Sequence, residues 1–228
     1  MQCSICGSSE FVSKKVLWAA LVDEWQLAPF EEEYVNRQQG TCCSVCGANL
    51  RSIALANALR SFLGESATLK DVVAARSTQE LEILEINEAG TLTPMLRQLG
   101  KYTYAAYPDV DMHALPYDAE TFDLVIHSDT LEHVEQPIHA LKECRRVLKP
   151  GGAVCFTVPV IVGRMSRSRK GLGNSYHGNP ATSKYDYVVQ TEFGADAWTC
   201  AMEAGFAEVA IHVLDYPAAT AFLARKAN

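Results

Sequence analysis

The sequence reads FDLVIHSDTLEHV over residues 122–134 and ALKECRRVLKPGG over residues 140–152. The first segment opens with an apolar run that is typical of a buried strand. The second belongs to a helical pattern over 136–148 and ends in Lys-Pro-Gly-Gly. Proline cannot continue a helix and glycine permits a tight turn. Together the two segments predict a strand, a helix packed beside it and a sharp return of the chain.

The same alternation extends to both sides of these segments. Strands joined through helices run parallel and form a sheet covered on both faces. Only a few residues around Tyr216-Pro217 separate the last two runs, so we expect the final strand to be antiparallel to its neighbour. Apolar runs that suit strands occupy 81–86, 101–107, 122–128, 153–160, 207–215 and 219–226, and further helical patterns lie near 94–99 and 194–204.

Composition and charge exclude several classes of protein. The chain has 228 residues, 48% of them hydrophobic, and a net charge of −7 at pH 7. Such an acidic globular chain is not expected to bind nucleic acid non-specifically. No apolar stretch approaches the about 20 residues of a membrane helix, and residues 1–10 show no secretory pattern. We therefore expect a cytoplasmic protein that does not associate with membranes.

Five of the eight cysteines lie within residues 1–50, and four of these form two copies of a C-x-x-C-G pattern. Each copy can point two thiolates at one ion, and four thiolates form a closed tetrahedral zinc site that holds structure. In a chain without an export signal, this spacing favours metal binding over disulfides. Cys42 competes with Cys43 for one position. The predicted zinc ligands are Cys3, Cys6, Cys43 and Cys46.

The segments quoted first, together with DMHALPY at 111–117, resemble class I S-adenosylmethionine-dependent methyltransferases of the type 11-like group. The resemblance covers about residues 80–228. YHGNP at 176–180 and TEFG at 191–194 are similar to a bacterial subfamily that also carries an N-terminal C-x-x-C pair. The resemblance implies an α/β fold with a Rossmann-like, doubly wound and mostly parallel sheet. We expect a zinc-binding module at 1–50, a helical connector at 51–79 and a methyltransferase domain at 80–228.

The resemblance also implies where S-adenosylmethionine would bind. Glu85 would lie near its methionine end, Asp111 would accept a hydrogen bond from the adenine amino group, and the backbone of Met112 would contact the ring. The chain departs from the family in its first loop, 87–91, which has a single glycine, and at Ala106, where the family has an acidic residue. The residues assigned to the cofactor are Glu85, Asn87, Ala89, Gly90, Asp109, Asp111, Met112 and His127.

Methyl transfer from a sulfonium needs mainly an acceptor held in line and, where required, a general base. Candidate bases follow the strand at 122–128, namely His127, Asp129 and His133, and His177 could reach the same face. Histidine titrates near the working pH, which suits proton transfer. Each candidate could equally have a structural role.

The long segment 161–192 is typical of a functional lid or a disordered stretch. Its basic run Arg164–Lys170 could attract an anionic acceptor or simply be solvated. The aromatic residues that could line an acceptor pocket, or pack this segment on the sheet, are Tyr176, Tyr185, Tyr187 and Phe193.

Three functions follow from these patterns. The leading hypothesis is methyl transfer to a small-molecule or glycan-linked acceptor. Zinc modules beside methyltransferase domains also suggest RNA methylation, which the acidic charge disfavours. The altered first loop suggests a third function, a non-catalytic binding or scaffold protein with a degenerate fold. The acceptor, the methylated atom and the oligomeric state are left open by the sequence.

Overall fold

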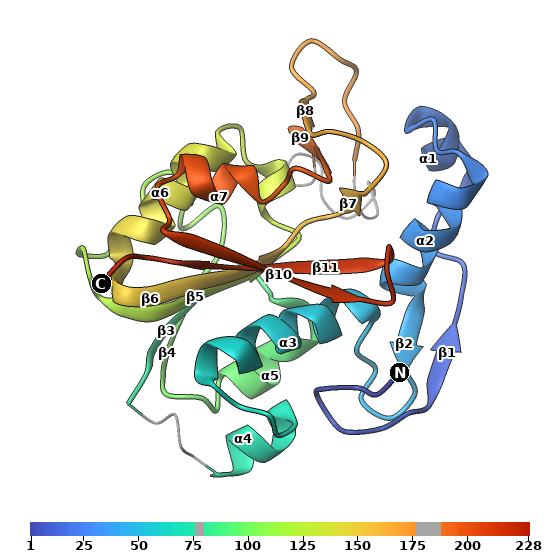
Figure 1. The fold of residues 1–228 in the computed structure, drawn as a ribbon. Helices are drawn as coiled ribbons and strands as arrows, with labels where there is room; N and C mark the ends of the chain where they lie inside the picture. The colour runs from blue at the N-terminus through green and yellow to red at the C-terminus, as the bar shows by residue number, and fades with distance from the viewer. Residues whose placement is uncertain (76–79, 177–187) are drawn as a thin grey trace.

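The computed structural model describes residues 1–75, 80–176 and 188–228. Its centre is a six-stranded sheet in the order β10-β11-β6-β5-β3-β4 (Figure 1). Strands β4, β3, β5 and β6 are parallel, whereas β11 is antiparallel to both β6 and β10. The predicted mostly parallel sheet with an antiparallel last strand is confirmed. The strands are β3 (Glu82–Ile86), β4 (Lys101–Ala105), β5 (Phe122–Ser128), β6 (Leu148–Thr157), β10 (Glu208–Leu214) and β11 (Ala219–Arg225).

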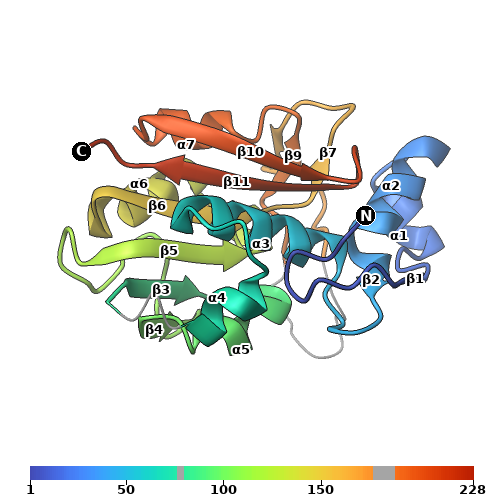
Figure 2. The same ribbon diagram turned by 60° about the horizontal axis from the view of Figure 1, so that its bottom comes forward.

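Helices cover both faces of this sheet, as a doubly wound fold requires (Figure 2). On one face Ile53 and Leu92 pack with Ile126 of β5, and on the other Leu141 packs with Phe156 of β6. One face carries α3 (Leu50–Leu63), α4 (Leu69–Ala75), the 3-10 turn η1 (Gly90–Leu92) and α5 (Thr93–Leu96); the other carries α6 (Pro137–Val147) and α7 (Thr199–Glu203).

Helix α3 is a layer of the fold and begins at a defined cap. The side chain of Asn49 accepts a hydrogen bond from the backbone N–H of Ser52 at 2.9 Å, and Gly64 ends the helix with φ +69°. Leu50, Ile53 and Leu59 are fully buried against the sheet. The division at residues 50 and 79 stays a prediction, but α3 does more than connect two parts, because it closes one face of the core.

The N-terminal segment forms a small module beside the sheet. Strands β1 (Phe11–Ser13) and β2 (Thr41–Cys43) pair antiparallel, and α1 (Ala19–Glu24) and α2 (Pro29–Gly40) lie between them in the chain. Proline at the first position of α2 suits a helix start. Glu31 then accepts a hydrogen bond from the backbone N–H of Ala28 at 2.9 Å.

Polar contacts dock this module onto the chain that follows β6. Trp25 Nε1 donates to Ser175 Oγ at 2.8 Å, and Gln38 Nε2 donates to the carbonyl of Val160 at 3.1 Å. Arg164 donates to the Glu31 carboxylate at 2.6 and 2.9 Å. The docked chain forms a small sheet in the order β7-β9-β8, made of β7 (Val160–Ile161), β9 (Thr191–Gly194) and β8 (Arg167–Ser168).

The predicted lid, 161–192, lies partly outside the described residues, so its closing role stays a prediction. Across residues 1–75, 80–176 and 188–228, none of the helices combines the length and the apolar character that a membrane span needs.

Candidate functional site

The order of the strands places the ligand crevice expected for this fold between β3 and β5. From β3 the chain passes to β4 on one side, and it then returns to β5 on the other side. In open α/β sheets, ligands bind at the carboxyl ends of the strands where the order reverses in this way. The loops after Ile86 and Ser128 therefore border the candidate site.

The loop after β3 is held by a buried carboxylate. Glu85 is fully buried, and its Oε1 accepts hydrogen bonds from the backbone N–H of Ala89 at 2.7 Å and from Thr93 Oγ1 at 2.6 Å. Tyr102 donates its hydroxyl to Oε2. Burial and the Glu85 carboxylate raise the pKa of Tyr102 to about 12, so the phenol keeps its proton. Glu85 thus shapes the glycine-poor loop, and its predicted place near the methionine end of the cofactor stays a prediction.

Two residues of this loop adopt left-handed backbone conformations, Asn87 at φ +55° and Gly90 at φ +59°. A Cβ on Gly90 would lie 2.8 Å from Ser52 Oγ of α3, so the single glycine of the loop is at the position that requires it. Asn87 Nδ2 donates to Thr130 Oγ1 at 3.3 Å, which joins the two loops across the crevice.

The loop after β5 carries Asp129, which forms an ion pair with Arg51 of α3. The Arg51 side chain is 3% exposed and that of Asp129 is 37% exposed. Arg51 Nε and Nη2 are buried and have no hydrogen-bond acceptor within the described part of the chain. Burial raises the pKa of Asp129 to about 6, although Arg51 acts to lower it. The crevice is therefore bordered by a buried guanidinium with two unused donors and a half-exposed carboxyl group.

Sequence reasoning missed Arg51. The available signal was its isolation, because it is the one charged residue in the otherwise uncharged stretch 50–59. Long charged side chains are rarely buried without a partner.

The segment predicted to contact adenine follows β4. Asp111 accepts a hydrogen bond from the backbone N–H of His113 at 2.8 Å, and the imidazole Nδ1 lies 2.8 Å from the same carboxylate. Both contacts lower the pKa of Asp111, the backbone contact most. Met112 is buried and Asp109 is exposed. The adenine and ribose roles of these residues stay predictions.

The four predicted bases have different surroundings. His127 is fully buried and stacks on Phe156 with ring centroids 5.2 Å apart, and neither of its nitrogens has a hydrogen-bond partner among the described residues. Burial lowers the pKa of His127 to about 4, so it is neutral at pH 7, and its position argues against proton transfer. His133 Nδ1 donates to the carbonyl of Val188 at 3.1 Å. His177 lies outside the described residues, and Asp129, paired with Arg51, lies in the loop directly after β5.

A narrow, mainly apolar cavity lies beyond the ends of β5 and β6. The 3-10 turn η2 (Leu131–His133) contributes Glu132 to it, and the N-terminal module contributes Trp25. Phe193, predicted for an acceptor pocket, is among its walls, whereas Tyr185 and Tyr187 lie outside the described residues. The lining residues are Trp25, Glu132, Pro159, Ile161, Val189, Thr191, Glu192 and Phe193.

The basic run after β7 is engaged by acidic residues of the same chain. Arg164 contacts Glu31, and Arg167 and Arg169 both contact Glu192. The pair with Glu31 connects this segment to the N-terminal module, and the two pairs with Glu192 lie within the small sheet and its flank, so the three arginines have structural partners.

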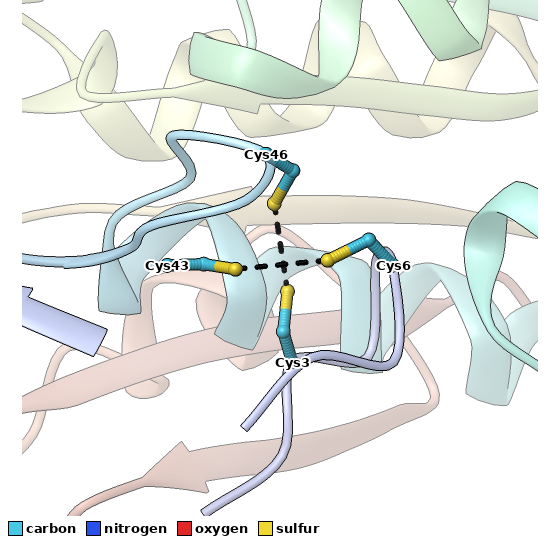
Figure 3. A group of neighbouring side chains, drawn as sticks. All are labelled: Cys3, Cys6, Cys43 and Cys46. Atoms are coloured by element: carbon cyan, nitrogen blue, oxygen red, sulfur yellow. Dashed lines mark hydrogen bonds between the residues drawn. The ribbon is translucent and has the colours of Figure 1, made fainter. Parts of the chain in front are cut away.

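The four predicted zinc ligands converge in one cluster (Figure 3). The Sγ atoms of Cys3 and Cys46 are 3.6 Å apart, as are those of Cys6 and Cys43, and all four lie within 4.8 Å of one another. Four thiolates around a tetrahedral zinc at about 2.3 Å would be about 3.8 Å apart. The donor set and its spacing therefore fit a zinc ion, and zinc occupancy itself stays a prediction.

The two cysteine turns repeat each other. The backbone N–H of Gly7 donates to the carbonyl of Cys3 at 2.8 Å, and that of Gly47 donates to the carbonyl of Cys43 at 2.9 Å. Both glycines have positive φ, +82° and +74°. Burial raises the pKa of Cys43, but hydrogen bonds from the backbone N–H groups of Cys46 and Val45 and from the neighbouring thiols together lower it to about 7, whereas burial raises the pKa of Cys3 and Cys46. A lowered thiol pKa favours the thiolate that zinc requires.

Cys42 lies outside this cluster. Its Sγ is directed to the backbone carbonyl of Gln39 at 3.6 Å, while Cys43 is buried within the cluster. The position that the sequence left open between Cys42 and Cys43 is therefore filled by Cys43 in the structure.

Part of the chain is similar to known methyltransferases. Residues 72–156 match the family model of a methyltransferase domain. Over 139 residues the chain is 32% identical to the ubiquinone biosynthesis O-methyltransferase of Coxiella burnetii, covering 60% of this chain and 50% of that protein. Over 114 residues it is 30% identical to the protein of the same name from Roseobacter denitrificans, covering 50% of this chain and 38% of that protein. The chain thus spans half the length, or less, of these curated relatives.

A solved S-adenosylmethionine-dependent methyltransferase from Mesorhizobium loti is 16% identical, with a TM-score of 0.45, and covers 71% of this chain and 99% of that one. So distant a likeness supports no conclusion of its own. The match over residues 72–156 and the strand order agree with each other. Residues 72–156 are thus similar to a methyltransferase domain, and the chain carries a four-cysteine cluster near its N-terminus.

Proposed function

We propose that this protein transfers a methyl group from S-adenosylmethionine to a small-molecule acceptor. The family match over 72–156 and the O-methyltransferase names of the relatives support the reaction type. The observation that carries the proposal is the buried Arg51 guanidinium, whose Nε and Nη2 have no acceptor in 1–75, 80–176 and 188–228.

A buried guanidinium with unused donors is costly, so its position favours an anionic ligand. The methionine end of S-adenosylmethionine has a carboxylate, which arginine can bind through two parallel hydrogen bonds. Asp129, half-exposed beside Arg51, would then face the cationic amino group of the same ligand. In the proposed site the ligand carboxylate faces the cationic Arg51, and the ligand amino group faces the Asp129 carboxylate.

The rest of the cofactor would follow the predicted contacts. The loop at Asn87, Ala89 and Gly90 would pass under the ligand, Asp109 would hold the ribose, and Asp111 and Met112 would hold the adenine. The bound cofactor would supply an electrophilic methyl group on its sulfonium. The protein would then contribute mainly the position of the acceptor.

The acceptor would bind at the cavity that Trp25, Ile161 and Phe193 line, which has a volume of about 10 Å³ and would widen around the bound molecule. Its narrow apolar walls favour a small molecule with an apolar body over a glycan-linked acceptor. Glu132 also lines this cavity and is the proposed proton acceptor for a hydroxyl group. The net charge of −7 and the internal ion pairs of the arginines disfavour RNA.

Equilibrium binding tests the cofactor site. Methylthioadenosine shares the adenosine and sulfur of S-adenosylmethionine but lacks the amino-acid end. Arg51→Gln should weaken S-adenosylmethionine binding roughly 10- to 100-fold and leave methylthioadenosine binding unchanged. Arg60→Gln, the same change at the far end of α3, is the matched control. Equal S-adenosylmethionine affinity in Arg51→Gln and the wild type would contradict the proposed role of Arg51.

Transfer of a labelled methyl group tests the acceptor class. The wild-type protein and labelled S-adenosylmethionine are incubated with a panel of small phenols and, separately, with total RNA. We expect label in the phenol fraction. Label in RNA alone would support the alternative function, and binding of the cofactor without transfer to any panel would favour a non-catalytic protein.

A further inference from the structure

We infer that the metal site of the four cysteines and the cofactor site at Arg51 are energetically coupled through the first turn of α3, so that metal binding sets the affinity for S-adenosylmethionine. The inference depends on the proposed function, because it concerns the same cofactor site. It assigns to Asn49 and the second cysteine turn a positioning role toward Arg51.

A short segment joins the proposed metal ligand Cys46 to Arg51. Cys46 and Arg51 are five positions apart. The backbone N–H of Cys43 donates to the carbonyl of Ala48 at 2.8 Å, and Asn49 caps α3 by accepting from Ser52 N–H at 2.9 Å. Ala48 and Leu50 are buried. The segment therefore has little freedom to absorb a movement of the cysteine turn.

The second step is the contact of the other cysteine turn with the same region of the fold. Ser4 Oγ donates to the carbonyl of Ile53 in α3 at 3.3 Å, and Ser4 accepts a hydrogen bond from the backbone N–H of Leu69 at 2.9 Å. An ion bound by both turns would join two segments that each touch α3. Loss of the ion would remove the bonds between them, because four thiols hold one another only weakly.

The third step connects α3 to the crevice. Arg51 pairs with Asp129 after β5, and Ser52 Oγ occupies the space beside Gly90 in the loop after β3. The first turn of α3 thus contacts both loops that border the site. A displacement of this turn would move the guanidinium away from the place where we propose a carboxylate to bind.

A purely structural metal would act differently from a coupled one. General loosening of the fold would weaken the binding of every ligand of the crevice. Coupling through Arg51 would weaken the binding only of ligands that carry the amino-acid end. Linkage also requires reciprocity, so S-adenosylmethionine would tighten zinc binding by the factor by which zinc tightens S-adenosylmethionine binding.

The experiment is a cycle of calorimetric titrations. S-adenosylmethionine and methylthioadenosine are titrated into zinc-loaded and chelator-treated protein, each as wild type and as Arg51→Gln. We expect zinc removal to weaken S-adenosylmethionine binding roughly 5- to 150-fold in the wild type, with methylthioadenosine unchanged. In Arg51→Gln, zinc removal should have no further effect. Saturating S-adenosylmethionine should lower the zinc dissociation constant of the wild type by the same factor.

Asn49→Ala provides a test that leaves the cysteines intact, in case the metal-free protein unfolds. Loss of the cap should weaken S-adenosylmethionine binding about fivefold with zinc retained, and Asn49→Ser, which can still cap, should restore it. Equal S-adenosylmethionine affinity with and without zinc, or an unaffected Asn49→Ala variant, would overturn the coupling and leave the proposed function standing. Failure of zinc-loaded wild type to bind the cofactor would instead overturn the proposed function.

Discussion

Two buried charged side chains, Glu85 and Arg51, differ in how fully their hydrogen-bonding groups are paired. Glu85 accepts hydrogen bonds from Ala89, Thr93 and Tyr102 and so fixes a loop that has few glycines. Among the described residues, Arg51 pairs with Asp129, and its Nε and Nη2 have no acceptor. A buried carboxylate whose oxygens all have hydrogen-bond partners indicates a structural role. A buried guanidinium with donors that lack partners indicates a site for a ligand.

Glu31 provides a prediction at the residue scale. Its side chain is 6% exposed and binds Arg164 of the docked chain. The hydrogen bonds from Arg164 lower the pKa of Glu31 below its ordinary value of 4.5. A lowered pKa in the folded state adds stability above pH 4.5, and this stability is lost as the pH falls through the lowered pKa.

Glu31→Gln should therefore reduce the free energy of unfolding by about 1–2 kcal/mol at neutral pH, with a smaller difference in acid. Urea unfolding across a pH series measures the difference in the free energy of unfolding between the variant and the wild type. Glu33→Gln, on the exposed face of the same helix, is the control and should change stability little. A deficit for Glu31→Gln that stayed constant down to the lowest pH would contradict the ion-pair account.

At the scale of elements, the six strands of the central sheet and a helix within 51–79 were predictable, whereas the role of this helix, α3, as a layer of the fold was not. Buried parallel strands need continuous apolar runs, and such runs in the sequence predict β3, β5 and β6. The two cysteine turns were equally clear, because ligand spacing is local. The role of α3 as a layer depends on which surface it covers, and the partners of Arg51 and Glu85 depend on tertiary contacts that local patterns do not encode.

The cysteine turns provide the prediction at this scale. Cys43→Ser should lower the zinc content well below one ion per chain and increase amide hydrogen exchange in 41–47 and at the start of α3. Cys42→Ser should keep one zinc and the wild-type exchange pattern, because Cys42 lies outside the cluster. Metal analysis with hydrogen-exchange mass spectrometry checks both. The opposite pattern, with Cys42 required and Cys43 dispensable, would show that the cluster is assigned wrongly.

At the scale of the whole molecule, the N-terminal module is integrated with the sheet. It docks through Trp25, Gln38 and Glu31 on one side, and it leads directly into α3 on the other. The cavity proposed for the acceptor includes Trp25, so the module also helps to build that site.

We therefore expect the zinc-loaded protein to unfold in one cooperative transition. In a Trp198→Phe variant, Trp18 and Trp25 report on the module by fluorescence, while far-ultraviolet circular dichroism follows the whole fold. The two denaturation curves should coincide. An earlier, separate fluorescence transition would show that the module is an independent domain, as the division at residue 50 would suggest.

The most direct test of the central claim is a crystal structure of the zinc-loaded protein with S-adenosylhomocysteine, the product form of the cofactor. The account predicts density across the ends of β3 and β5, with the ligand carboxylate hydrogen-bonded to Arg51 and the adenine beside Asp111 and Met112. An empty crevice at saturating ligand, or a ligand bound with Arg51 still directed only at Asp129, would contradict it.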